Sequence, residues 1–318
     1  MKPHRRVIAA VADGGFSLLA LGGGLHPRAR PERHGVERIR GLSYGEGVRR
    51  LDVWRPVDRP GPLPAMLYLH GGGFQQLSRD THWLMALAFA RQGMVVFSAD
   101  YRLAPRHPFP AAHEDACAAL AWVQEHAAEH GGDADRLSLA GDSAGGNLVA
   151  SLAVACSWRR PEAYAAALFD SGVRPRAVLA KYGMFQVSDS ARLFRQRAMP
   201  WVVQERIVDV EDCYLPQGAQ EFADPLLVLE QAGPVDRELP AFFLPVGTGD
   251  PLLDDTRRME AALQRRGASV EARYYPGELH GFTGFIWREQ ARQAWADMFR
   301  FLADRELVAD GDAKPAFG

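Results

Sequence analysis

The alternation of apolar and polar positions predicts strands and helices that follow one another along most of the chain. Apolar or alternating runs predict strands at residues 48–54, 65–69, 94–98, 137–140, 177–182, 241–246 and 270–275. Apolar residues at helical spacing predict helices at residues 81–92, 111–130, 147–155, 254–266 and 286–302. Such alternation is typical of an α/β protein with a mostly parallel central sheet and helices on both faces. Ligands of these proteins bind beyond the carboxyl ends of the strands.

Residues 183–223 interrupt this alternation. The segment is rich in aromatic and basic residues, among them Phe185, Phe194, Arg195 and Trp201, and it predicts an inserted helical piece. An aromatic insertion suggests an apolar pocket for an acyl group, although aromatic stripes more often belong to a core.

Length and composition are those of an ordinary globular protein. The 318 residues are enough for one large α/β domain. A formal net charge of -2 leaves no basic excess for nucleic-acid binding, so a small molecule is the expected partner. The 3 cysteines, Cys117, Cys156 and Cys213, are scattered and odd in number, which disfavours a disulfide framework or a cysteine zinc site. We therefore expect a protein of the reducing cytoplasm.

Residues 1–25 combine a basic start with apolar residues, as an export signal does. Asp13, Gly14 and Gly15 interrupt the apolar stretch, and no run of about 18 apolar residues is present. We expect an N-terminal helix that packs on the body of the protein. A membrane-surface role, with Phe16 and its apolar neighbours facing lipid, is the weaker alternative.

A reactive serine is predicted where the strand at 137–140 gives way to the following helix. Residues 141–145 match the pattern G-x-S-x-G, with Ser143 at its centre. The flanking glycines allow a sharp bend and leave the serine oxygen uncrowded. An ordinary Gly/Ser turn is the structural alternative, so the motif needs partners elsewhere in the chain.

A serine hydroxyl becomes a nucleophile only when a base removes its proton, and a carboxylate must orient that base. In α/β-hydrolases these groups follow in the order serine, aspartate or glutamate, histidine. Of the 10 histidines, only His280 lies after Ser143, in a loop that follows the strand at 270–275. His280 is therefore the expected base.

Several aspartates lie between Ser143 and His280, and their positions distinguish them. Asp250 stands in a glycine-containing turn directly after the strand at 241–246. Asp255 is the second candidate, but it and Asp254 have the position of helix-capping residues. Asp224 precedes a proline and is typical of a turn.

Attack on an ester creates an oxyanion, which needs preorganised N–H donors. One donor is expected from Ala144, the residue after the serine. A second loop must supply the others, and the glycines at 71–73 follow the strand at 65–69, where bare backbone could approach a substrate. A flexible linker is the alternative, but this run is short and lacks serine.

Together these motifs resemble a known family. The chain contains HGGGF at 70–74, DYRLAPRHPFPAAHED at 100–115, GDSAGGNL at 141–148, GDPLLDD at 249–255 and LHGF at 279–282. In this order they resemble the hormone-sensitive-lipase-like family of α/β-hydrolases, the bacterial family IV carboxylesterases. The likeness extends over about residues 65–302.

The resemblance implies an α/β-hydrolase fold with a small helical cap and a serine carboxylesterase that acts through an acyl-enzyme. It implies short- to medium-chain acyl esters as substrates, with no cofactor and no metal. The implied site has Ser143, Asp250 and His280 as the catalytic triad and Gly72, Gly73 and Ala144 as oxyanion donors.

The resemblance also implies a division of the chain. The expected parts are an N-terminal cap segment at 1–45, the hydrolase core at 46–182 and 224–305, an inserted cap segment at 183–223 and a tail at 306–318. The expected partner is a small-molecule ester, and an exposed edge strand of this fold could pair in a homodimer. Membrane and nucleic-acid partners are not expected.

Two other functions fit parts of the chain. His126, Glu129 and His130 match H-x-x-E-H, a pattern of zinc hydrolases, but they lie at a helix end, where the helix dipole also favours histidine. The family also resembles plant gibberellin receptors, which bind a small molecule without catalysis and have lost the catalytic histidine. His280 is present here, which disfavours a receptor. Dehalogenases and epoxide hydrolases of this fold use an aspartate as the nucleophile. That alternative is disfavoured because the turn carries Ser143.

Overall fold

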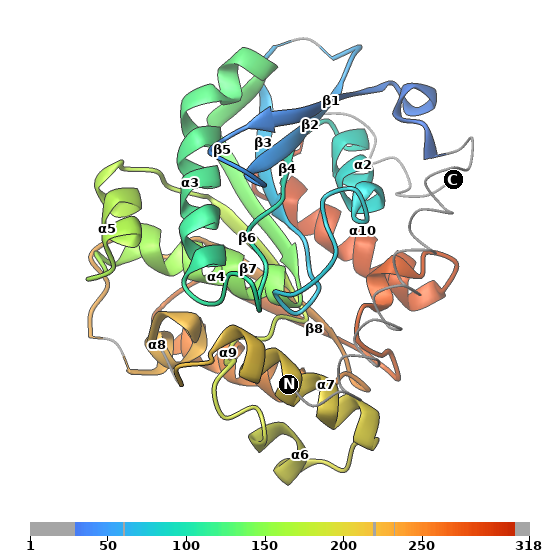
Figure 1. Ribbon diagram of the computed structural model, residues 1–318. Coiled ribbons are helices and arrows are strands. Elements are labelled where there is room, and N and C mark those ends of the chain that lie inside the picture. Colours follow the sequence, from blue (N-terminus) through green and yellow to red (C-terminus); the bar gives the residue numbers. More distant parts are fainter. Residues whose placement is uncertain (1–28, 60, 219–220, 232, 309–318) are drawn as a thin grey trace.

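The structure is a computed structural model that describes residues 29–59, 61–218, 221–231 and 233–308 (Figure 1). The N-terminal helix and the membrane-surface alternative predicted for residues 1–25 lie outside the described residues. Among the described helices, none has the length and apolar character needed to cross a membrane.

One sheet of 8 strands forms the centre of the molecule, in the order β1-β2-β4-β3-β5-β6-β7-β8. The strands are β1 (Val36–Ser43), β2 (Arg50–Pro56), β3 (Leu63–Leu69), β4 (Val95–Ala99), β5 (Gly132–Asp142), β6 (Ala177–Lys181), β7 (Ala241–Gly247) and β8 (Val270–Tyr275). β1 and β2 pair antiparallel with their neighbours, and the remaining pairs are parallel. The predicted α/β-hydrolase fold is confirmed.

Helices cover both faces of the sheet (Figure 1). The longer ones are α2 (Trp83–Arg91), α3 (Ala111–His126), α4 (Ala144–Ser157), α5 (Ala163–Asp170), α7 (Trp201–Tyr214), α8 (Pro225–Gln231), α9 (Leu253–Arg265) and α10 (Glu289–Ala303). The shorter ones are α6 (Arg192–Gln196) and the 3-10 turns η2 (Pro31–His34), η3 (Ala127–His130), η4 (Glu221–Ala223) and η5 (Phe282–Gly284). α2 and α10 share one core with the sheet, and α3, α4 and α9 share the other.

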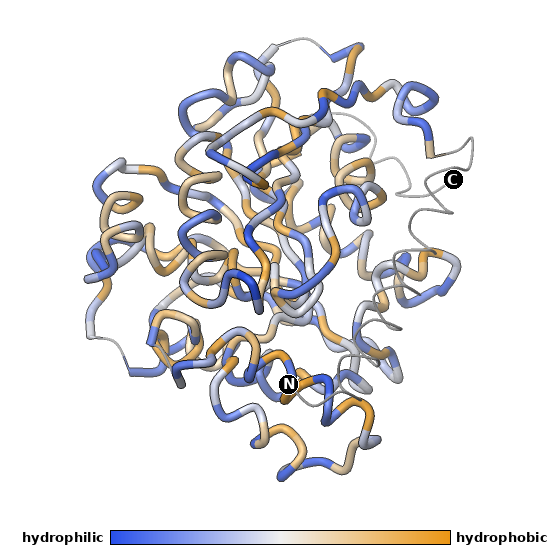
Figure 2. The backbone as a smooth tube through the Cα atoms, viewed as in Figure 1, coloured by the Kyte–Doolittle hydropathy of each residue, from blue (hydrophilic) through white to orange (hydrophobic). Residues whose placement is uncertain are grey.

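The two cores explain why the central strands are apolar throughout. Every residue of β3, β4 and β6 is buried, because helices exclude water from both faces. Hydrophilic residues lie mainly along the outer loops and helices (Figure 2).

The sequence pattern missed part of the edge of the sheet. Residues 36–43 were expected inside the cap segment at 1–45, but they form β1 and pair with β2, so that part of the expected division is wrong. The side chains of β1 are mostly half-buried, and a strand without a sharp apolar alternation carries a weak signal. The helices α5 and α8 were also missed. The long helix predicted at 111–130 ends at His126 and continues as η3.

The insertion at 183–223 is helical, as predicted, and contributes α6, α7 and η4. α7 packs against the loop that follows β3. The Tyr214 ring at the end of α7 stacks on the Phe74 ring, with centroids 3.9 Å apart, and the Gln75 amide donates to the Asp209 carbonyl at 3.2 Å. This contact places the insertion beside the carboxyl ends of β3 and β5.

Candidate active site

Ser143 occupies the turn between β5 and α4, at the carboxyl end of the sheet. Its φ of 54° lies in a region that non-glycine residues rarely adopt. Backbone hydrogen bonds hold this conformation: the Ser143 N–H donates to the Lys181 carbonyl at 3.0 Å, and the Ser143 carbonyl accepts from Met184 at 3.3 Å and from Asn147 at 3.1 Å. The flanking glycines are required because a side chain at Gly145 would collide with the end of β3.

The three side chains predicted for the triad converge at this turn. His280 Nε2 lies 2.9 Å from Ser143 Oγ, and His280 Nδ1 lies 2.9 Å from the nearer carboxylate oxygen of Asp250. Each residue comes from a different turn or loop, after β5, after β7 and after β8. With a proton on Nδ1, the imidazole donates to Asp250, and Nε2 is free to accept the serine proton.

The Asp250 carboxylate is fixed and buried. Its Oδ1 accepts from the Leu252 N–H at 2.8 Å, and its side chain is 0% exposed. The turn that carries it packs on the histidine loop, because the Gly249 N–H donates to the Glu278 carbonyl at 2.9 Å. The carboxylate therefore meets His280 with little freedom to rotate.

The environment of His280 favours its protonated form. Burial lowers the pKa of the imidazole, but the charge and hydrogen bond of Asp250 outweigh burial, so the pKa is raised above its ordinary value. The side chain is 36% exposed, which leaves the imidazole open to water. The Tyr182 ring meets it edge-on, at 5.1 Å between centroids.

The glycine loop after β3 has backbone geometry suited to close approach. Gly72 has a φ of 116° and Gly73 a φ of 61°. A side chain at Gly72 would collide with the Gln76 backbone, and a Cβ at Gly73 would lie 2.8 Å from Val210 Cγ2 on α7. Ala144 is the first residue of α4, where N–H groups have no partner inside the helix. Among the turns and loops that the structure describes, no backbone carbonyl accepts a hydrogen bond from the N–H of Gly72, Gly73 or Ala144.

The arrangement of Ser143, His280 and Asp250 agrees with the family that the chain matches. Residues 66–284 match the α/β-hydrolase fold family. The chain belongs to the hormone-sensitive-lipase-like family of α/β-hydrolases. A carboxylesterase of Mycobacterium tuberculosis, NlhH, is 34% identical over 264 residues, which cover 81% of this chain and 78% of the relative.

Other relatives of the hydrolase have similar names. An acetyl esterase of Salmonella paratyphi A is 31% identical over 248 residues, which cover 76% of this chain and 71% of that protein. Among solved structures, an esterase of Pyrobaculum calidifontis superposes with a TM-score of 0.75 at 28% identity, covering 97% of this chain and 100% of that chain.

The other aspartates of the hydrolase have different partners. Asp255, the second candidate, is buried; it pairs with Arg192 at 2.5 Å and accepts from the Gln186 N–H at 3.0 Å. Asp254 pairs with Arg257 at 3.2 Å on the surface of α9. Asp224 does more than form a turn, because its carboxylate accepts backbone N–H groups at the start of the insertion.

The sequence pattern did not single out the charged group closest to the serine turn. Asp142, the residue before Ser143, points its carboxylate under the turn and contacts Tyr68 and His82. Lys181, at the end of β6, is completely buried beside the same tyrosine. The sequence does contain a signal for this buried charge, because Lys181 interrupts the apolar run at 177–182.

The histidines of the H-x-x-E-H pattern pack against an aromatic ring. His126 stacks on Trp122 at 4.4 Å between centroids, and His130 stacks on the same ring at 6.0 Å. The Nδ1 atom of His126 lies 2.9 Å from the Trp122 carbonyl oxygen. In the part of the chain that the structure describes, no group of three His, Cys, Asp or Glu side chains is placed to hold one metal ion.

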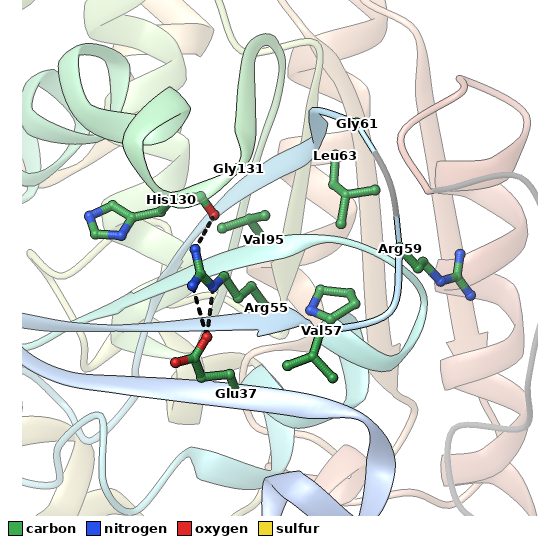
Figure 3. Close-up of a pocket in the computed structure, with 10 residues that line it drawn as sticks. Glu37, Arg55, Val57, Arg59, Gly61, Leu63, Val95, His130 and Gly131 are labelled. Carbon is green, nitrogen blue, oxygen red and sulfur yellow. Dashed lines mark hydrogen bonds and ion pairs between the residues drawn. The ribbon is translucent and has the colours of Figure 1, made fainter.

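A cavity of about 310 Å³ lies at the other end of the sheet, near the first residues of β3 and β4 (Figure 3). Arg55 projects into it, but its guanidinium already pairs with Glu37 at 2.9 Å and reaches the His130 carbonyl at 3.5 Å. Burial lowers the pKa of His130, which favours its neutral form. This cavity is separate from the serine turn, which stands at the carboxyl ends of the strands.

Proposed function

We propose that the protein is a serine carboxylesterase that hydrolyses short- to medium-chain acyl esters through an acyl-enzyme on Ser143. The observation that carries this proposal is the unbroken hydrogen-bond line from Ser143 Oγ through His280 to Asp250. Membership of the hydrolase family and the esterase names of the relatives support the same reaction.

In the acylation step, His280 Nε2 takes the proton of Ser143 while Oγ attacks the ester carbonyl carbon. Asp250 stabilises the imidazolium that results. The carbonyl oxygen becomes an oxyanion and accepts N–H groups of Gly72, Gly73 and Ala144. The tetrahedral intermediate then expels the alcohol, which receives the proton from His280, and the acyl group remains on Ser143.

In the deacylation step, water replaces the alcohol. His280 takes a proton from the water as its oxygen attacks the acyl carbon, and the same N–H donors stabilise the second oxyanion. The intermediate collapses, the proton returns to Ser143 and the carboxylic acid leaves. The exposure of His280 gives water access to the base.

The preference for short to medium acyl chains rests on the position of the insertion. α7 packs over the glycine loop, and Val210 lies close to Gly73. α7 mixes apolar and charged side chains, and both Val210 and the Arg206 guanidinium lie close to Gly73. A helix this close to the proposed oxyanion donors is expected to restrict the length of the acyl chain. The acetyl esterase among the relatives supports the short end of this range.

The test is a hydrolysis screen of p-nitrophenyl esters from acetate to palmitate, with and without diethyl p-nitrophenyl phosphate. We expect turnover to fall for the longest chains, the organophosphate to abolish it, and mass spectrometry to place a diethylphosphoryl group on Ser143. Hydrolysis that resists the organophosphate but stops on chelation would contradict the proposal and point to the histidines at 126 and 130. Binding of esters without turnover would indicate a receptor.

A further inference from the structure

Lys181 is a completely buried lysine directly beside the serine turn. Its ammonium donates to the Tyr68 hydroxyl at 3.1 Å and lies 3.5 Å from the Met85 sulfur. It also stands over the rings of Tyr68 and Trp295, at 5.1 and 5.5 Å from their centroids. A buried ammonium is costly unless other groups compensate its charge, so its position calls for a functional reason.

The compensating charge is the carboxylate of Asp142. The Tyr68 hydroxyl, which accepts from Lys181, donates to Asp142 Oδ1 at 2.5 Å. The other carboxylate oxygen lies 3.3 Å from His82 Nε2. Asp142 and Lys181 are also register partners on the adjacent strands β5 and β6. A line of polar groups thus connects Lys181 to the residue before Ser143.

This line reaches both sides of the proposed oxyanion site. Asp142 is bonded covalently to Ser143, and a Cβ at Gly71 would lie 2.5 Å from Asp142 Oδ2, so the carboxylate touches the glycine loop. The Lys181 carbonyl accepts the Ser143 N–H at 3.0 Å. The serine turn and the glycine loop therefore rest on one charged cluster.

The charge of Asp142 has a consequence for catalysis. During the reaction, negative charge develops on the substrate oxygen above the glycine loop, and a nearby carboxylate opposes it. In a low-dielectric interior the repulsion between these two negative charges is strong. Two groups favour the charged carboxylate: His82, which lies directly at its Oδ2 atom, and the ammonium of Lys181, which reaches its Oδ1 atom through the Tyr68 hydroxyl.

We propose that Lys181 is a positioning residue of the esterase reaction, which acts through Tyr68 to hold the Asp142 carboxylate and balance its charge beneath the serine turn. This proposal rests on the serine mechanism proposed above. Lys181 does not touch the substrate, so its removal is expected to lower kcat and to leave KM nearly unchanged.

The groups that face Lys181 are the Tyr68 phenol on β3, the Asp142 carboxylate on β5, the Met85 thioether on α2 and the Trp295 indole on α10. Burial lowers the pKa of Lys181 to about 8, and Asp142 opposes that shift. The ammonium is therefore expected to lose its proton at mildly alkaline pH, and kcat is expected to fall there.

The state of Asp142 agrees with this arrangement. Burial alone would raise the pKa of its carboxyl, but His82, Lys181 and the Tyr68 hydroxyl outweigh burial and hold the pKa well below its ordinary range. Asp142 is thus charged throughout the working pH range, so we assign the expected alkaline fall of kcat to Lys181 rather than to Asp142.

The experiment compares the wild type with Lys181→Met, Tyr68→Phe and the control Tyr275→Phe. Tyr275 also donates from a buried phenol to an aspartate, Asp297, at 2.8 Å, but this aspartate lies on α10 and not in the serine turn. For each protein, kcat and KM are measured from pH 6.5 to 10 on one short-chain ester. Circular dichroism and the stoichiometry of organophosphate labelling report the folded fraction and intact nucleophile.

We expect Lys181→Met to lower kcat by about 10- to 100-fold with KM within about two-fold, and to lose the alkaline fall of kcat. Tyr68→Phe is expected to lower kcat about 3- to 10-fold, and Tyr275→Phe to keep it. A folded Lys181→Met protein with the wild-type kcat or an unchanged pH profile would overturn the proposal. If Lys181→Met does not fold, a wild-type kcat in Tyr68→Phe overturns it.

Failure of this proposal can be distinguished from failure of the serine mechanism. If organophosphate labels Ser143 in all variants and stops their turnover, the mechanism stands whatever Lys181 does. If labelling at Ser143 leaves turnover intact, the mechanism itself is wrong.

Discussion

His280 Nε2 lies 2.9 Å from Ser143 Oγ, although 137 positions separate the two residues in the chain. The contact forms because both follow strands of one mostly parallel sheet, whose carboxyl ends meet along a common edge.

Replacing Ser143 by alanine should remove turnover and keep the fold. The alanine has no nucleophilic oxygen, and loss of a triad nucleophile lowers kcat by about 10⁶-fold. The measurement is kcat on a short-chain ester, with circular dichroism as the check on folding. Ser171→Ala is the control, since the Ser171 hydroxyl only caps the Leu168 carbonyl at 2.7 Å. An active Ser143→Ala protein would rule out the proposed nucleophile.

The pH dependence of kcat/KM should show an acid limb set by His280. Only the neutral imidazole accepts a proton, so activity rises as pH increases through the pKa of His280. Asp250 raises that pKa, so the limb should lie above about 6.5, the ordinary histidine value. A limb centred well below that pH would contradict the proposed pairing.

Asp250→Asn should shift this limb to lower pH, because the neutral amide no longer favours the imidazolium. The same change should lower kcat by about 10⁴-fold, since an amide can hold the imidazole in the wrong tautomer. Asp254→Asn is the matched control, as Asp254 forms a surface pair with Arg257. A pH profile that stays at its wild-type position in Asp250→Asn would show that another group sets the limb.

Asp255→Asn should affect stability and spare catalysis. Asp255 is the buried counter-charge of Arg192, and loss of one partner of a buried pair costs about 3–5 kcal/mol. Urea denaturation measures the loss, and kcat per folded molecule should equal that of the wild type. A loss of kcat as deep as in Asp250→Asn would instead place Asp255 in the reaction.

Gly73→Ala should impair catalysis more than folding. A Cβ there would meet Val210, and the backbone has a φ of 61°, so the loop must shift and misplace its N–H donor. Loss of one oxyanion donor lowers kcat by about 10²- to 10³-fold. Gly267→Ala is the control, because Gly267 has a φ of 71° in open space far from the serine turn. Equal kcat losses in both variants would exclude a specific role for Gly73.

Much of the site was predictable because its motifs are local. The G-x-S-x-G turn lies where a strand pattern ends and a helix pattern begins, and the structure has β5 and α4 there. His280 was the only histidine after Ser143, so the order of groups in the family left one candidate base. Asp250 was preferred over Asp255 from its place directly after a strand, and it is the aspartate that meets His280.

Other features have no local signal. β1 is an edge strand whose identity depends on pairing with β2, and its own residues alternate weakly. The stack of Tyr214 on Phe74 depends on how the insertion folds back over the glycine loop. Such contacts join distant segments, and no short window of sequence contains both partners.

Local chemistry thus specified the order of strands and helices, the reactive turn and the identity of its partners, because backbone propensity and motif spacing act over a few residues. The order of strands in the sheet decided which buried side chains from distant segments meet. Lys181 lies beside Tyr68 and Asp142 only because β5 stands between β3 and β6, which brings three separate segments to one buried point. Burial there gives a lysine a lowered pKa and a role that its neighbours in the chain do not reveal.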